Sequence, residues 1–315
     1  MEIFQFLFLV IFLVILFYIL NLIIQSYYQQ IKKGFIEKNK LDLQFTYHIH
    51  DSKDSKEYIL PKVIYCYWNK EDNALINAFI NTWRRNIGKD WKIEFVTDDT
   101  LLKYVDMDFF NKFYELKEKE AFRFADFLRF YLLIKNGGVW MDASMIVLDG
   151  DFLDEYWKEM HQKKADLLVY ELDKYHVRQA PYLENWFLMA PKNSRFAIDI
   201  YNEFLYAYDY GWYRYKRKIL EPSIFIESTL HGNSIYLIQH AIIMYLLRYR
   251  RYHYIVKDAN KSMYKICNLY NWDRHKMIDH IIHKDLSGIY AIKINGYQRK
   301  AIQNTDEMIA KLNSL

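Results

Sequence analysis

One stretch decides the fold of this chain: Glu120-Ala-Phe-Arg-Phe-Ala-Asp126-Phe-Leu-Arg129-Phe-Tyr-Leu-Leu-Ile-Lys-Asn136-Gly137-Gly138-Val-Trp-Met-Asp142-Ala-Ser144-Met-Ile-Val-Leu148. Residues 121 to 135 are apolar on nearly every side and contain no Pro or Gly, which favours a helix packed between other elements. The Asn-Gly-Gly sequence can close that helix, and residues 139 to 141 then form a short buried strand. Asp142 is therefore expected where a strand ends.

Two charged features of this stretch are hard to explain by packing alone. Asp126 and Arg129 are three residues apart, so they share one face of the predicted helix, on an apolar stripe. A buried ion pair costs desolvation and often contributes no net stability, so its presence indicates a site. Asp142 stands where open α/β sheets place their ligand groups. The structural alternative is that Asp126 is held between Arg123 and Arg129, and that Asp142 only begins a turn.

The chain before this stretch alternates strands and helices. Residues 60 to 68 form an apolar run that Pro61 starts, typical of an interior parallel strand. Residues 74 to 85 favour a helix, and residues 91 to 99 a strand followed by an acidic turn. This alternation predicts an α/β fold with a predominantly parallel, Rossmann-like sheet. Asp98, in the acidic turn, either caps the next helix or contacts a ligand.

The order of acid, arginine three residues later, apolar helix end, Gly-Gly, aromatic and Asp resembles the signature of capsular polysaccharide synthesis-type glycosyltransferases, a group related to glycosyltransferase family 32. The resemblance implies a GT-A type nucleotide-sugar-binding fold in which Asp126 and Arg129 hold the donor near Gly138. It also implies that Asp142 begins an Asp-x-Asp-like motif, with Ser144 in place of the second acid. Asp142 and Ser144 would bind Mn²⁺ or Mg²⁺ together with the donor diphosphate and water.

Two further segments resemble the same enzymes. The run from Pro61 to Trp68 matches their opening strand, which implies that Trp68, and secondarily Tyr67, contacts the nucleotide base; a buried core tryptophan is the alternative. The segment Glu184-Asn185-Trp186-Phe187 implies hydrogen bonds and apolar faces for the donor sugar or the acceptor. The alternative for this segment is an ordinary sheet strand with a turn.

The resemblance therefore predicts a hexosyltransferase that moves a sugar from a nucleotide-sugar donor to a glycan or polysaccharide acceptor, with metal assistance and with retention of configuration. Asp142 and Arg129 are the expected catalytic residues, because the metal and the guanidinium would neutralise the leaving diphosphate. Because of Ser144, a pseudoenzyme that binds sugar nucleotides or glycans is one alternative. A membrane-tethered interaction protein is another. A net charge of only +4, spread along the chain, argues against a nucleic-acid partner.

Length and hydropathy predict three parts. Residues 3 to 24 are uncharged and apolar enough to cross a bilayer core, so residues 1–25 are expected to anchor the chain as a single-pass membrane protein. Residues 26–57 are polar and resemble a stalk, and residues 58–315 form the catalytic domain. Lysines follow the apolar segment and none precedes it, which favours a cytoplasmic catalytic domain; a lumenal, Golgi-like orientation is the alternative.

Overall fold

The structure, a computed structural model, describes residues 17–20, 57–70, 73–172, 181–220 and 235–315. The chain divides into two units, Met1–Gln44 and Phe45–Leu315. Of the first unit only residues 17–20 are described, and they are helical. The second unit contains all the strands and the remaining helices of the described chain.

The predicted membrane anchor requires a correction. Among the described residues no helix has the length and apolar character needed to cross a bilayer. This finding contradicts the prediction of a single-pass membrane protein, whether its catalytic domain was placed in the cytoplasm or in a lumen. Residues 1–16 and 21–25 of the predicted anchor, and residues 26–56 of the predicted stalk, lie outside the described residues.

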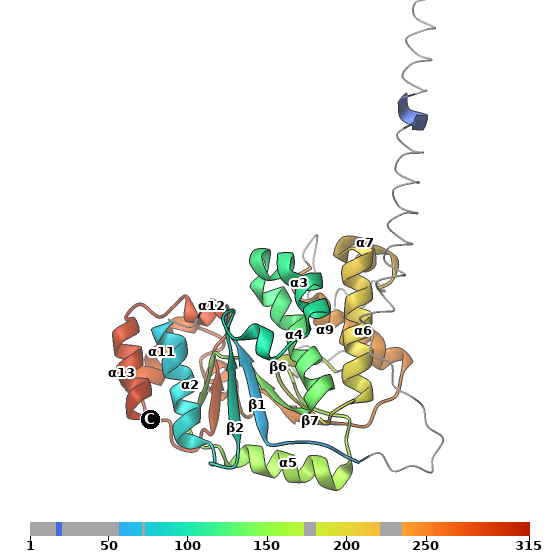
Figure 1. Cartoon of the computed structure of the whole chain (residues 1–315). Coiled ribbons are helices and arrows are strands. Elements are labelled where there is room, and N and C mark those ends of the chain that lie inside the picture. The colour runs from blue at the N-terminus through green and yellow to red at the C-terminus, as the bar shows by residue number, and fades with distance from the viewer. Residues whose placement is uncertain (1–16, 21–56, 71–72, 173–180, 221–234) are drawn as a thin grey trace, which may run out of the picture. The chain divides into compact units, whose positions relative to one another are not determined.

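A six-stranded sheet runs through the second unit in the order β2-β1-β3-β6-β5-β7 (Figure 1). Its strands are β1 (Val63–Tyr67), β2 (Lys92–Val96), β3 (Gly138–Met141), β5 (Leu167–Glu171), β6 (Leu183–Ala190) and β7 (Tyr254–Asp258). β1 is parallel to β2 and β3, and β5 is parallel to β7, whereas β6 is antiparallel to both of its neighbours. The predicted, mostly parallel sheet is confirmed, and β6 is its exception.

The reversed direction of β6 matters for the site. Met141, the last residue of β3, lies opposite Phe187, and Gly138 lies opposite Ala190. The first residues of β6 therefore reach the edge at which the parallel strands β1 and β3 end. Side chains from the end of β1, the end of β3 and the start of β6 can meet there, at the ligand-binding edge of an open α/β sheet.

Helix α4 (Ala121–Asn136) packs on β1, β3 and β6, as the apolar stretch in the sequence predicts. Around it lie α3 (Met107–Lys119), α6 (Arg195–Tyr210), α7 (Trp212–Lys218) and α9 (Ile238–Tyr249), on one side of the sheet (Figure 1). The other elements are α2 (Ala74–Asn86), the short helix at Leu101–Lys103, α5 (Asp151–Lys163), α10 (Lys265–Leu269), α11 (Arg274–His283), α12 (Gly296–Arg299) and α13 (Thr305–Ser314).

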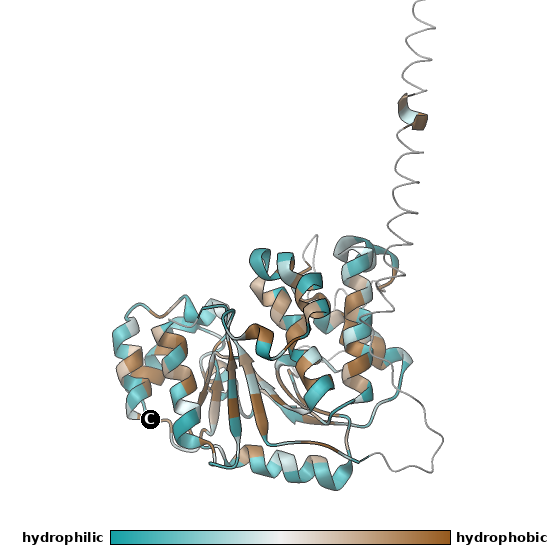
Figure 2. Ribbon diagram, viewed as in Figure 1, coloured by the Kyte–Doolittle hydropathy of each residue, from teal (hydrophilic) through white to brown (hydrophobic). Residues whose placement is uncertain are grey.

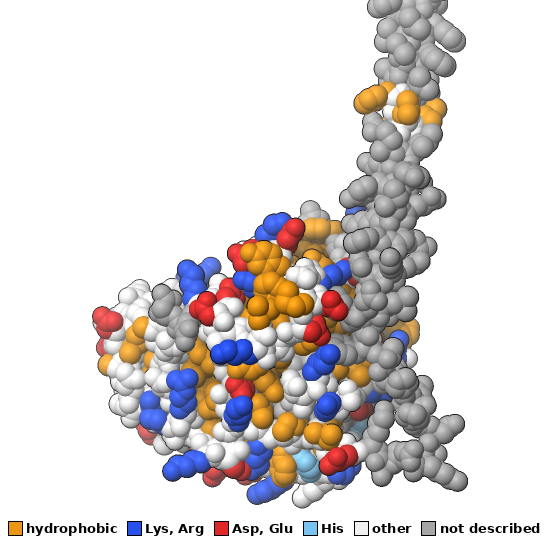
Figure 3. Space-filling view, in the orientation of Figure 1, with side chains coloured by type: hydrophobic (Ala, Val, Ile, Leu, Met, Phe, Trp, Pro, Cys, Tyr) orange, Lys and Arg blue, Asp and Glu red, His pale blue; other side chains and the backbone are white. Residues whose placement is uncertain are grey.

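Figure 2 shows hydrophobic residues concentrated on the strands and on the inner sides of the helices, with hydrophilic residues outside. Burial of these apolar side chains is the main favourable contribution to folding. On the molecular face seen in Figure 3, basic and acidic side chains are interspersed, and hydrophobic side chains gather near α3. Met107 and Tyr114 of that helix are exposed.

A second, two-stranded sheet pairs β4 (Met145–Val147) with β8 (Ala291–Lys293) in antiparallel fashion. Helix α2 holds this sheet from one side. The Trp83 indole N–H donates to the Met145 carbonyl at 2.8 Å, and the Val147 N–H donates to the Thr82 hydroxyl at 3.0 Å. Because these groups are buried, each bond satisfies a polar atom that would otherwise be costly. The small sheet therefore brings the C-terminal β8 next to the residues that follow β3.

Gly137 joins α4 to β3, Gly138 is the first residue of β3, and both need a conformation that favours glycine. Their φ angles are +73° and +116°. A Cβ atom on Gly138 would also lie 2.6 Å from the Val63 carbonyl oxygen of the adjacent strand. The tight Gly-Gly step lets α4 end directly against the sheet, so that β3 starts beside β1.

We expect Gly138→Ala to lower the free energy of unfolding by roughly 2–4 kcal/mol, because backbone strain and a steric clash act together. Urea denaturation measures the loss. Gly211→Ala is the matched control, since Gly211 has a φ of +92° and nothing within 4 Å of the added methyl group. The control should carry the strain alone and lose less; equal losses in the two variants would contradict the proposed crowding at Gly138.

Candidate functional site

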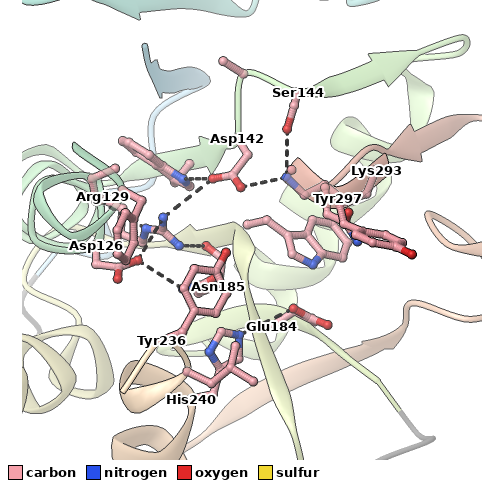
Figure 4. Close-up of a pocket in the computed structure, with 18 of the residues that line it drawn as sticks. Asp126, Arg129, Asp142, Ser144, Glu184, Asn185, Tyr236, His240, Lys293 and Tyr297 are labelled. Atoms are coloured by element: carbon pink, nitrogen blue, oxygen red, sulfur yellow. Dashed lines mark hydrogen bonds and ion pairs between the residues drawn. The ribbon is translucent and has the colours of Figure 1, made fainter. Parts of the chain in front are cut away.

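A pocket of about 560 Å³ opens at the edge where β1 and β3 end (Figure 4). Side chains from both sheets and from α4, α9 and α12 line it. Those used below are Tyr67, Trp68, Asp126, Arg129, Trp140, Asp142, Ser144, Glu184, Asn185, Trp186, Tyr236, His240, Lys293, Tyr297 and Arg299. The structure thus brings most of the residues predicted from the sequence into one cavity.

Asp126 is the centre of a buried polar network. Its carboxylate lies 3.0 Å from an Arg123 guanidinium nitrogen and 3.2 Å from one of Arg129. It also accepts a hydrogen bond of 3.3 Å from the Asn185 amide. The Gln239 amide N–H donates to the Asp126 backbone carbonyl at 3.0 Å. The arrangement expected on structural grounds, with Asp126 held between two arginines, is therefore present, although Asp126 also lines the pocket.

Arg129 links α4 to β6 and to Asp142. One terminal nitrogen donates to the Asn185 carbonyl at 2.6 Å, and Nε donates to the Ala125 carbonyl at 3.2 Å. The other terminal nitrogen, which pairs with Asp126, also lies 3.7 Å from Asp142 Oδ1. The planar fork of a guanidinium can make these contacts in several directions at once, which an ammonium cannot.

Asp142 stands at the corner of the pocket just after β3. Its backbone N–H donates to the Trp186 carbonyl at 2.8 Å, which fixes the corner against β6. The Trp140 indole N–H donates to Oδ1 at 3.0 Å, and Lys293 Nζ donates to Oδ2 at 2.8 Å. Burial acts to raise the pKa of Asp142, but Lys293 and Arg129 outweigh it and lower the pKa below its ordinary value. The carboxylate is therefore ionised throughout the neutral range.

The predicted metal ligands are already in contact with a lysine. Lys293 Nζ lies 2.8 Å from Asp142 Oδ2 and 3.0 Å from Ser144 Oγ (Figure 4). Among the described residues no cluster of three or more His, Cys, Asp or Glu could hold a metal ion. A divalent ion about 3–4 Å from an ammonium would be repelled by roughly 10 kcal/mol at an effective dielectric constant of 20. As arranged, this set of ligands does not fit Mn²⁺ or Mg²⁺, and the metal site stays a prediction.

The base-binding candidates lie at the end of β1. Trp68 lines the pocket, and the Arg299 guanidinium carbon lies 5.1 Å from the centre of its ring. Tyr67 also reaches the pocket, while its hydroxyl donates to Asp98 at 2.6 Å. Asp98 itself does not line the pocket. It positions Tyr67 and pairs with Lys117 at 2.9 Å.

Gly138 is likewise outside the pocket, although the resemblance places it with the donor. It lies at the first position of β3, whereas the pocket opens beyond the last, and its Cβ position points at the Val63 carbonyl. Its role in the structure is to allow the close approach of β3 to β1. Neither Asp98 nor Gly138 joins the group of side chains around Asp142.

The start of β6 forms the other wall. Glu184 lies 3.6 Å from His240 Nε2 of α9, and the His240 ring stacks on Tyr182. The side chain of Trp186 stacks on Tyr170. Within the described part of the chain, His240 Nδ1 and the Trp186 indole nitrogen are buried and have no hydrogen-bond partner. Buried polar atoms without partners are costly, so these two atoms indicate a place for a polar ligand.

Several pocket residues were not predicted from the sequence: Tyr236, His240, Lys293, Tyr297 and Arg299. One signal was present for Lys293, a lone basic residue between two isoleucines, which is the same kind of signal that identified Asp126. Tyr236, just before α9, offers no such pattern, because its place depends on tertiary contacts. The Arg123 guanidinium donates to the carbonyls of Ile235 and Tyr236 at 2.9 and 3.3 Å.

A family model described as capsular polysaccharide synthesis protein matches residues 16–290. The chain belongs to this family. The resemblance identified in the sequence is thereby confirmed. A search of curated protein sequences found no match to this member of the capsular polysaccharide synthesis family.

Solved structures that resemble the chain are described as glycosyltransferases. The PaToxG glycosyltransferase is 12% identical, with a TM-score of 0.37, and the match covers 89% of this chain and 94% of that one. A glycosyltransferase involved in glycosylation of the major capsid of PBCV-1 is 9% identical, with a TM-score of 0.39 and coverage of 80% and 98%. The apo form of GlyE from Streptococcus pneumoniae TIGR4 is 10% identical, with a TM-score of 0.41 and coverage of 81% and 63%.

We expect Asp126→Ala to destabilise the protein by about 3–5 kcal/mol, because it leaves two buried guanidinium groups without their shared carboxylate. Chemical denaturation followed by circular dichroism measures the change. Glu115→Ala is the control: its ion pair with Lys119 is exposed, and its loss should cost less than about 1 kcal/mol. If the two variants were equally stable, Asp126 would not organise the buried network.

Proposed function

We propose that this chain is a glycosyltransferase that moves a hexosyl group from a nucleotide-sugar donor to a glycan acceptor. The observation that carries the proposal is the pocket at the ends of β1 and β3, which combines an aromatic platform, a cluster of basic side chains and buried polar atoms without partners. Membership of the capsular polysaccharide synthesis family supports the same reaction class. A nucleotide sugar needs all three features, for its base, its diphosphate and its sugar hydroxyls.

The charges of the pocket suit an anionic leaving group. Arg123 and Arg129 share the carboxylate of Asp126, so with Lys293 and Arg299 there are four basic side chains for the three carboxylates of Asp126, Asp142 and Glu184. This excess of positive charge would bind the donor diphosphate and stabilise the negative charge that develops when the glycosidic bond breaks. Arg129 is held by Asn185 and Ala125 before any ligand binds, so little reorganisation is needed.

The two ends of the pocket suit different parts of the substrates. Trp68, with Arg299 beside its ring, is our candidate platform for the nucleotide base, and Tyr67 supports it. Glu184, Asn185 and Trp186 would contact the transferred sugar or the acceptor, where the free His240 and Trp186 nitrogens offer hydrogen bonds. Aromatic faces and hydrogen-bonding groups together are suited to sugars, which present both apolar and hydroxyl surfaces.

The direct test is an assay of the purified chain against a panel of sugar nucleotides, with release of nucleoside diphosphate as the measurement. We expect turnover of one or a few donors, and NMR of the product should show retained anomeric configuration. Binding of a donor without turnover would instead identify a sugar-nucleotide-binding protein. If no member of the panel raised the melting temperature or was consumed, the proposed function would be wrong, since a ligand that binds the native state must stabilise it.

We expect Arg129→Lys to lower kcat/KM by about 100-fold while the protein stays folded, because a point donor cannot replace the fork that contacts Asn185, Asp126 and the Asp142 corner. Steady-state kinetics with the active donor measures the loss. Arg217→Lys is the control, because Arg217 is exposed on α7 and outside the pocket. A near-normal rate for Arg129→Lys would mean that Arg129 has only a structural role.

A further inference from the structure

We propose that the ammonium group of Lys293 takes the place of a divalent metal in this enzyme, so that sugar transfer needs no metal ion. The inference rests on the proposed function and names the group that stabilises the leaving diphosphate. It departs from the metal site that the family resemblance implies, because the two side chains expected to bind the metal, Asp142 and Ser144, both contact Lys293.

The position of Lys293 is fixed by the backbone on both sides. Its own N–H donates to the Met263 carbonyl at 3.1 Å, and the next residue, Ile294, donates to the Ser144 carbonyl at 3.0 Å. Met145 is its partner across the small sheet. The side chain is only 5% exposed. Lys293 is therefore part of the folded framework of the pocket.

The ammonium group of Lys293 has both of the predicted metal ligands as partners. Its Nζ donates to one oxygen of Asp142 and to the Ser144 hydroxyl, so both of these acceptors are used by the ammonium. Asp142 and Ser144 therefore act as the anchors of a cation that belongs to the protein.

Other basic groups extend the positive charge toward the base-binding end. Arg299 lies beside Trp68, and Arg129 lies 3.7 Å from the far oxygen of Asp142. A donor whose base stacks on Trp68 would place its diphosphate among these three cations. Fixed positive groups can supply the charge stabilisation that a metal supplies in other enzymes, provided that they are held in place before the reaction.

The chemical step balances without a metal. The bond between the sugar anomeric carbon and the diphosphate oxygen breaks, and its electron pair stays on that oxygen, which accepts a hydrogen bond from Lys293. The acceptor hydroxyl oxygen forms the new bond to the anomeric carbon. Its proton ends on the released nucleoside diphosphate. No oxidant, reductant or further reactant takes part.

The first test uses the full wild-type chain and compares activity in EDTA with activity in added Mn²⁺ or Mg²⁺. We expect the rates to agree within about twofold. We also expect uridine or guanosine diphosphate to bind in EDTA, as measured by calorimetry. Titration of Mn²⁺ alone, followed by electron paramagnetic resonance, should show no stoichiometric binding. A tenfold or greater loss in EDTA that Mn²⁺ or Mg²⁺ restores, or one bound Mn²⁺ per chain, would overturn the proposal.

The second test replaces the ammonium by an apolar group of similar length. Lys293→Met should lose at least about 100-fold in transfer and about tenfold in diphosphate affinity, without rescue by metal. Lys276→Met is the control, because Lys276 is exposed on α11 and lies outside the pocket. Normal transfer by a folded Lys293→Met variant would overturn the proposal; if that variant does not fold, the wild-type comparison in EDTA decides. Failure to bind any nucleoside diphosphate with or without metal would refute the proposed function itself.

Discussion

The buried carboxylate of Asp126 is the interaction on which the rest of the site depends. It joins Arg123 and Arg129 on α4 to Asn185 on β6, and its backbone carbonyl accepts a hydrogen bond from Gln239 on α9. Two buried guanidinium groups could not stay in this apolar layer without a shared anion. The network therefore fixes the relative positions of three elements, and it directs Arg129 toward Asp142.

The direction of β6 has a comparable effect on the architecture. A strand parallel to its neighbours would carry Glu184 and Asn185 to the opposite edge of the sheet, far from Asp142. Because β6 is antiparallel, these residues lie at the edge where β1 and β3 end. The hydrogen bond from the Asp142 N–H to the Trp186 carbonyl then closes the corner. The site is thus built mainly by backbone pairing, which leaves side-chain groups available for ligands.

The charges around Asp142 give the pocket its chemical character. A carboxylate next to Lys293 and Arg129 stays ionised, and in return it holds both cations at one corner. The negative charge of Asp142 thus positions basic groups that can act on a diphosphate. Charged groups in a partly buried site act on a bound ligand more strongly than the same groups in water. This view accounts for a serine at position 144, whose hydroxyl accepts a hydrogen bond from the lysine.

The sequence by itself determined the features that depend on local pattern. The apolar run of α4, the Gly-Gly step, the strand-helix alternation and the acid after β3 were all predicted, and with them the mostly parallel sheet and the family. Asp126 and Arg129 were recognisable because a charged pair on an apolar helix face is unusual. Asp142 was recognisable because the strand before it is short and clearly bounded.

Only the tertiary structure decided which distant side chains join that local unit. Lys293 follows Asp142 by 151 positions, and it reaches the corner because β8 pairs with β4. His240 and Arg299 enter through the packing of α9 and α12, and Gly138 and Asp98 fall outside the pocket for the same kind of reason. Local periodicity sets which face of an element is buried. It does not set which element packs against that face, because that choice depends on contacts between residues far apart in the chain.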